Sequence, residues 1–205
     1  MEGSAADRRT RQQERRERRS AVTDPDIVLA AAAALLAIRS RTTHDLRVRL
    51  ITLGYPAGLA DVTIDRMLAL GYLDDEAYAR AWVAGRDRSR PRGAAALRRE
   101  LLRKGLAPAL VDAALDEREA GRQVAATNTG TNDDSRPDHG SSADHAAALR
   151  LLDRRRNALL RERDPRKRRQ RAYALLARNG FDPGVCMEVT RGYLMDTEED
   201  PSERV

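Results

Sequence analysis

The chain is poor in the residues that build disulfide-bonded or β-rich proteins. It has one cysteine, Cys186, and only seven aromatic residues among 205. A single cysteine cannot form an internal disulfide, which is typical of proteins in a reducing cytosol. Val, Ile and Thr never alternate with polar residues over the length of a strand. A sandwich, a barrel or a large sheet is therefore not expected.

Long apolar runs are also missing. The longest, Ile27 to Ile38, has twelve residues, whereas a bilayer requires ~20. The first twenty residues carry charges where a signal peptide would carry its apolar segment. We therefore expect a soluble, cytoplasmic protein.

Sequence motifs of catalysis are absent as well. There is no P-loop, no dinucleotide-binding glycine pattern and no nucleophile elbow. The three histidines, His44, His139 and His145, lack the spacing of metal ligands. We expect no enzymatic activity, no catalytic residue, no metal and no cofactor.

The residues that are abundant favour helices. Ala, Leu, Arg and Glu dominate the chain. Asp-Pro pairs at 24–25, 164–165 and 182–183 place a capping side chain before a proline at the first helical position. Thr42 with Asp45 resembles a capping box. Apolar residues at helical spacing predict nine helices, so the expected fold class is all-α.

Three glycines mark a repeat. A leucine stands four residues before each glycine, and a large apolar or aromatic residue follows it. This pattern indicates a helix that ends in a left-handed glycine cap, with the next residue folding back over the helix end. The glycines and the residues after them are Gly54-Tyr55, Gly105-Leu106 and Gly180-Phe181. We predict an elongated array of three tandem three-helix repeats.

Composition sets the predicted boundaries. The segments 1–22 and 119–143 have few apolar residues to bury and are expected to be disordered, although 1–22 could be marginally helical in isolation. The predicted order is a basic arm at 1–22, repeats at 23–73 and 74–118, a polar insertion at 119–143, a third repeat at 144–195 and an acidic tail at 196–205.

The stretch 71–106 resembles the RecX family of regulatory proteins. The resemblance is carried by Gly71-Tyr72-Leu73-Asp74-Asp75-Glu76-Ala77-Tyr78-Ala79, Arg86, Arg90-Pro91-Arg92-Gly93 and Leu97-Arg98-Arg99-Glu100-Leu101-Leu102-Arg103-Lys104-Gly105-Leu106. A weaker similarity covers 27–117 and 144–195. The resemblance implies a modulator, usually an inhibitor, of the RecA recombinase, which binds in the groove of the RecA filament on single-stranded DNA. The basic arm and the polar insertion depart from the family pattern.

Part of this stretch is expected to have structural roles. The carboxylates of residues 74–76 suit the first turn of a helix, and capping explains them better than a nuclease metal site does. We expect the aromatic and apolar residues to pack the seam between the first two repeats. The predicted structural residues are Gly71, Tyr72, Leu73, Asp74, Tyr78 and Trp82.

Positive charge suggests where partners bind. The formal net charge is +6, and 36 of the 38 basic residues are Arg. Guanidinium groups suit phosphate and carboxylate equally well, so charge alone does not choose between DNA and an acidic protein surface, and a solvated face is the remaining alternative. The residues that we predict to contact RecA or DNA are Arg86, Arg90, Arg92, Arg98, Arg99, Arg103, Lys104, Arg155, Arg166, Arg168 and Arg169.

Two functional hypotheses remain at this stage. In the first, a monomer binds the RecA filament and contacts single-stranded DNA mainly through it, with weak binding to DNA alone. In the second, the chain is a stand-alone helical DNA-binding module that acts on the phosphate backbone. The second hypothesis leaves the 71–106 signature unexplained.

Overall fold

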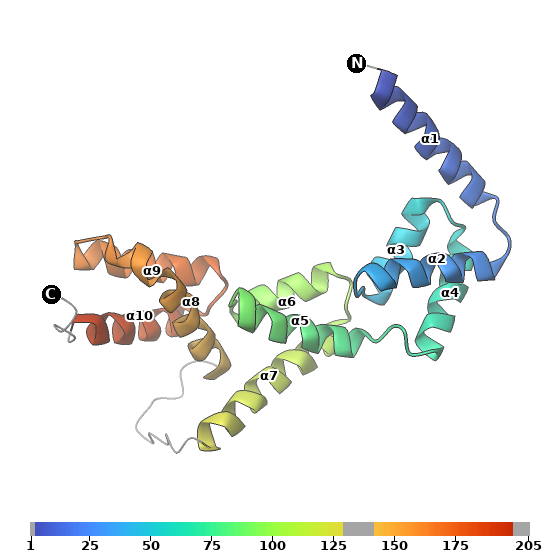
Figure 1. The fold of residues 1–205 in the computed structure, drawn as a ribbon. Helices are drawn as coiled ribbons and strands as arrows, with labels where there is room; N and C mark the ends of the chain where they lie inside the picture. Colours follow the sequence, from blue (N-terminus) through green and yellow to red (C-terminus); the bar gives the residue numbers. More distant parts are fainter. Residues whose placement is uncertain (1–2, 129–141, 199–205) are drawn as a thin grey trace. The chain divides into compact units, whose positions relative to one another are not determined.

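The fold is built of α-helices throughout the residues described. The computed structural model describes residues 3–128 and 142–198, and these ranges form ten helices and no strand. Figure 1 shows the course of the chain through them. The expected all-α class is confirmed. The helices are α1 (Gly3–Ser20), α2 (Pro25–Ile38), α3 (Thr43–Leu53), α4 (Ala57–Ala69), α5 (Asp75–Ser89), α6 (Ala94–Arg103), α7 (Pro108–Asn128), α8 (Ser142–Leu160), α9 (Pro165–Arg178) and α10 (Pro183–Glu198).

Helix starts lie where the polar side chains predict them. The carboxylate of Asp24 accepts from the backbone of the residue two positions later, at 2.9 Å, and Asp164 does the same at 2.8 Å. Thr42 Oγ1 accepts from the backbone N–H of Asp45 at 3.0 Å. Asp74 caps α5 by accepting from the amide three positions later at 2.8 Å. These bonds satisfy backbone donors that the first helical turn leaves without partners.

Helix ends confirm the glycine pattern. Gly54, Gly105 and Gly180 have φ values of 107°, 79° and 81°, in the left-handed region. The residue after Gly54, Tyr55, donates its backbone N–H to the Leu50 carbonyl and is buried. The three-helix repeats are therefore α2–α4, α5–α7 and α8–α10, as predicted, and α1 precedes them.

The two segments expected to be disordered differ from expectation. Residues 3–20 of the predicted arm form the helix α1. Helix α7 continues to Asn128 and α8 begins at Ser142, so helix occupies residues 119–128 and 142–143 of the predicted insertion at 119–143. The remainder of that insertion, 129–141, and residues 199–205 of the predicted acidic tail lie outside the described residues.

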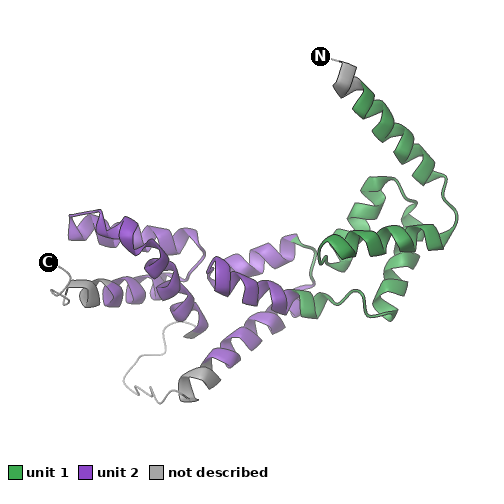
Figure 2. Ribbon diagram, viewed as in Figure 1, with its two compact units in different colours: residues 1–78, 104–106 green, residues 79–103, 107–205 purple. Residues whose placement is uncertain are grey.

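The chain divides into two compact units, coloured in Figure 2. Unit 1 comprises residues 1–78 and 104–106, and unit 2 comprises residues 79–103 and 107–205. The core of unit 1 is formed by α2, α3 and α4, and its largest fully buried side chains are Leu46, Leu50 and Met67. In unit 2, α8, α9 and α10 enclose a second core around Leu152, Leu176 and the other buried side chains of the third repeat.

Crossing a bilayer requires a helix that is both long and apolar. None of the described helices combines the length and the hydropathy that crossing a membrane requires.

Candidate functional site

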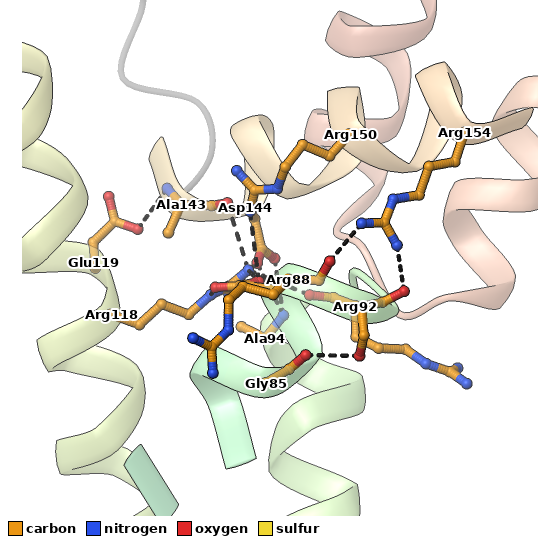
Figure 3. Close-up of polar contacts among 12 residues, drawn as sticks. Gly85, Arg88, Arg92, Ala94, Arg118, Glu119, Ala143, Asp144, Arg150 and Arg154 are labelled. Atoms are coloured by element: carbon orange, nitrogen blue, oxygen red, sulfur yellow. Dashed lines mark hydrogen bonds and ion pairs between the residues drawn. The ribbon is translucent and has the colours of Figure 1, made fainter. Parts of the chain in front are cut away.

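A buried arginine joins the second and third repeats within unit 2. The Arg118 guanidinium, on α7, reaches two carboxylates at once (Figure 3): its Nε donates to Asp87 at 2.8 Å and its Nη1 to Asp144 at 2.6 Å. Its Nη2 donates to Asp87 at 3.0 Å and to the Arg92 carbonyl at 3.3 Å. The side chain is only 6% exposed. Arg118 is therefore a structural residue that ties α5 and α7 to α8.

Burial and hydrogen bonding act in opposite directions at this junction. Burial disfavours the charged form of Arg118, but its hydrogen bonds to Asp87 and Asp144 outweigh that effect and raise the pKa of the guanidinium. Burial raises the pKa of the Asp144 carboxyl, while the Ala94 amide and Arg118 oppose the rise. A buried pair of this kind is expensive to break, since removing one partner leaves the other charge without compensation.

Backbone groups complete the junction. Asp144, at the start of α8, accepts from the backbone N–H of Ala94 at 3.1 and 3.0 Å, so it caps the start of α6 across the repeat boundary. Arg154 donates to the carbonyls of Arg88 and Ser89 at the end of α5. Side chains of α8 therefore satisfy both the start of α6 and the end of α5.

The Arg-Pro-Arg-Gly motif at 90–93 ends at a close backbone contact with the third repeat. The backbone N–H of Gly93 donates to the Asn179 carbonyl at 3.1 Å. A Cβ at Gly93 would clash with the backbone of Gly180, and a Cβ at Gly180 would lie 2.5 Å from the Ala96 Cβ. The sequence predicted a left-handed cap at Gly180 but gave no sign of this second constraint. Part of the 71–106 signature therefore serves to dock repeats.

Three of the predicted contact arginines are paired with carboxylates. Glu100 accepts from Arg86 at 2.8 Å and from Trp82 Nε1 at 3.0 Å, and Arg92 lies 3.6 Å from its other oxygen. The Arg86 guanidinium also stacks 4.5 Å from the Trp82 ring. On α6, Arg98 forms an ion pair with Asp112. These pairs hold α5, α6 and α7 together and offset three of the positive charges.

The other predicted arginines of the second repeat form no ion pair with a described carboxylate. Arg90, Arg99 and Arg103 are exposed, and no described carboxylate pairs with any of them. Arg99 and Arg103 are four residues apart on α6, so they share one face of that helix. Arg103 Nε donates to the Arg99 carbonyl at 3.2 Å. These guanidinium groups remain available for an anionic partner.

Lys104 belongs to unit 1 rather than to this surface. Its ammonium lies 5.5 Å from the centre of the Tyr78 ring. Its carbonyl accepts from Thr42 Oγ1 at 2.7 Å. The residue is half-buried, so its role is at least partly structural.

In the third repeat, two of the four predicted residues line a groove between α9 and α10. Arg166 and Arg169 line a cavity of about 430 Å³ together with Tyr173 and Met187. Arg155 is exposed on α8, and Arg168 is half-buried and donates to the Glu162 carbonyl at 3.1 Å. The remaining residues that line the cavity are Gln170, Thr190 and Arg191. The groove therefore combines three guanidinium groups with an apolar wall.

The residues expected at the seam between the first two repeats fall in both units. Leu73 is buried in the core of unit 1, as its apolar character predicts, and Tyr72 is 68% exposed. Tyr78 lies against Lys104 in unit 1, and Trp82 lies against Glu100 in unit 2. Packing of these side chains between the first two repeats therefore stays a prediction.

Some residues of this site were missed by the sequence analysis. Arg118, Asp87 and Asp144 come from three helices, and nothing in their spacing indicates that they meet. Tyr173 on α9 could have been found, since it follows Arg166 and Arg169 at helical spacing on one face. Arg191 comes from another helix and carries no such signal.

No group of metal-ligating side chains forms among residues 3–128 and 142–198. His145 Nε2 lies 3.5 Å from a carboxylate oxygen of Glu188. The His44 side chain lies so close to Gly105 that a Cβ at that glycine would clash with it. His139 lies outside the described part of the chain. Cys186 is fully buried in the core of the third repeat, and burial raises the pKa of its thiol. It is therefore a small core residue.

The fold is that of a helical-repeat protein, and the buried Arg118 connects its second and third three-helix repeats. Two family models match it: "RecX, second three-helix domain" at residues 74–115 and "RecX, third three-helix domain" at residues 143–190. A "Regulatory protein RecX" from Mycobacterium ulcerans is 32% identical over 158 residues, covering 76% of this chain and 78% of the relative. One from Streptomyces coelicolor is 30% identical over 166 residues, covering 81% and 77%.

A solved structure agrees on the fold. The chain matches a crystal structure of RecX from Lactobacillus salivarius with a TM-score of 0.61 at 15% identity, covering 82% of this chain and 95% of that one. The chain belongs to the RecX family of regulatory proteins. The relatives are named as regulatory proteins and not as enzymes.

Proposed function

We propose that this protein regulates the RecA recombinase by binding the RecA filament on single-stranded DNA, and that it inhibits filament activity. Family membership supports the choice of RecA as partner, since the RecX resemblance implies a RecA modulator. The observation that carries the proposal is the face of α6 on which Arg99 and Arg103 are exposed and have no carboxylate partner in the described chain.

Two surfaces of unit 2 would contact the filament. The first is the face of α6 that carries Arg99 and Arg103, which we call the α6 surface, and Arg90 in the preceding loop would add a further guanidinium group. The second is the α9–α10 groove, with Arg166 and Arg169 at its edge. Arg86, Arg92 and Arg98 no longer belong to the proposed contacts, because Glu100 and Asp112 already engage them.

The mechanism is steric and electrostatic. The junction around Arg118 and the contact between Gly93 and Gly180 hold the second and third repeats in one arrangement, so the two surfaces keep a fixed spacing. A ligand shifts an equilibrium only through its different affinities for the states involved. Binding that blocks RecA addition or favours RecA loss would lower filament ATPase activity without chemistry by this protein.

The test compares RecA-coated and bare single-stranded DNA. Binding of the full chain is measured on both at the same near-physiological salt concentration, and filament ATPase activity is followed in parallel. We expect clear preference for the coated strand and a fall in ATPase activity. Equal or tighter binding to bare DNA, with unchanged ATPase activity, would favour the stand-alone DNA-binding module instead.

A further inference from the structure

Helix α1 is anchored to the first repeat in unit 1. Arg19 donates from its Nη1 to the Leu53 carbonyl at 3.3 Å, and its guanidinium lies 5.6 Å from the centre of the Tyr55 ring. The Arg16 carbonyl approaches Gly54 so closely that a Cβ there would lie 2.8 Å from it. The end of α3 and the last turns of α1 are thus in direct contact, although α1 has no apolar face of its own.

This contact creates a groove in which all the charge is positive. The cavity has a volume of about 560 Å³, and no lining residue carries a carboxylate. The residues that line it are Arg8, Arg11, Gln12, Arg15, Arg16, Arg19, Thr52 and Leu53. This groove belongs to unit 1, whereas the α6 surface and the α9–α10 groove belong to unit 2.

The acidic residues of α1 lie on another face. Glu14 pairs with Arg18 at 3.8 Å, and Glu17 accepts from Gln13 at 2.8 Å, four residues earlier. At 100° per residue these positions point away from the centre of the arginine face. The helix therefore separates its charges: a face of arginines in the groove, and a face of mixed charge outside it.

The shape of the arginine face favours a linear polyanion. Arg8, Arg15 and Arg19 follow one another along the helix, and the rise of ~1.5 Å per residue spreads the face over roughly 16 Å. A single carboxylate would engage only one of these groups. A lipid surface is a poorer fit, because α1 has no apolar side chain larger than Ala to enter the membrane interface.

We propose that the α1 groove is a second nucleic-acid site, which binds the phosphate backbone of a single strand without reading its sequence. Guanidinium groups bind phosphate oxygens through paired, charge-assisted hydrogen bonds. No lining side chain is aromatic, so bases have no stacking platform in the groove. The site does not depend on RecA, and it would let the protein hold a strand outside the filament contact.

The test uses bare oligo-dT and the full chain without RecA. Binding is measured over a series of salt concentrations for the wild type, for R11Q/R15Q in the groove and for R9Q/R18Q on the same helix. Both variants lose two positive charges, but Arg9 and Arg18 do not line the groove. Far-ultraviolet circular dichroism checks that helix content is unchanged.

We expect R11Q/R15Q to weaken binding roughly tenfold and to lower the slope of log K against log salt by about 1.4, or ~0.7 for each lost phosphate contact. R9Q/R18Q should change affinity less than about threefold. Equal losses in the two variants, or none in R11Q/R15Q, would overturn the proposal. So would poly-glutamate competing as well as oligo-dT. Failure of R11Q/R15Q to weaken binding to oligo-dT would not change the preference for RecA-coated DNA, because that preference is measured in a separate experiment.

Discussion

Arginines of the second repeat have two opposite surroundings. At the repeat junction, Arg118 is buried and bonded to two carboxylates and two neighbouring carbonyls. On α6, Arg99 and Arg103 are exposed, and within the described chain no carboxylate pairs with them. The residue type is the same, so the difference lies in the acidic partners that the fold supplies.

This contrast shows that the number of basic residues in a segment does not tell which of them can bind a partner. The basic residues of the second and third repeats are concentrated at 86–104 and 154–171, and each of these two clusters mixes side chains that hold helices together with side chains that are exposed to solvent. Arg86 and Arg98 belong to the first kind, since Glu100 and Asp112 hold them. An exposed guanidinium without a carboxylate is a better criterion for a binding residue than membership of a cluster.

The largest effect should follow from breaking the junction. Replacement of Arg118 by alanine leaves Asp87 and Asp144 facing each other without their shared counter-ion. We expect the free energy of unfolding of unit 2 to fall by about 3–5 kcal/mol, the usual cost of removing one partner of a buried ion pair. The measurement is urea denaturation followed by circular dichroism.

Arg122→Ala is the matched control for this prediction. Arg122 is exposed and lies one turn further along α7. Its removal should change stability by less than about 0.5 kcal/mol. Equal stability of the two variants would show that the Arg118 network does not hold the repeats together.

A smaller loss of stability is expected from the glycine contact. Gly93→Ala places a Cβ against the backbone of Gly180, and overpacking of this kind costs about 1–3 kcal/mol. Gly121→Ala is the contrasting variant, because that glycine lies inside α7 with no atom near the added Cβ. It should raise stability by about 0.5–1 kcal/mol through helix propensity. Thermal denaturation of both variants tests the sign of each change.

The smallest effect on stability belongs to the α6 surface. The double variant R99A/R103A removes no ion pair in the described chain and leaves α6 with alanines, which favour helix. Its free energy of unfolding should stay within about 0.5 kcal/mol of the wild type. A loss comparable with that of Arg118→Ala would mean that these arginines are structural and would remove the basis of the comparison.

Local features were predictable from the sequence, and long-range ones were not. The caps at Asp24, Thr42 and Asp164 and the left-handed glycines involve residues within a few positions of each other, so their spacing identifies them. The junction depends on Arg118 meeting Asp144, 26 positions further along the chain and beyond a polar segment. Their contact is decided by packing between helices.

The same reasoning applies to α1. Its sequence has no apolar stripe, and from pattern alone a disordered arm was the natural expectation. The structure holds the helix through Arg19, which bonds to a carbonyl at the end of α3 and stacks on Tyr55. A single polar anchor of this kind leaves no periodic signal in the sequence.

The central claim is that the unpaired arginines of α6 bind the filament. The most direct test is the affinity of R99E/R103E for RecA-coated single-stranded DNA, measured beside R66E/R178E. The control variant loses the same charge at exposed positions near the ends of α4 and α9. We predict that R99E/R103E binds at least about 30-fold more weakly, because reversal abolishes two charge-assisted contacts, while R66E/R178E stays within about threefold. Equal weakening in both variants, or none in R99E/R103E, would contradict the account.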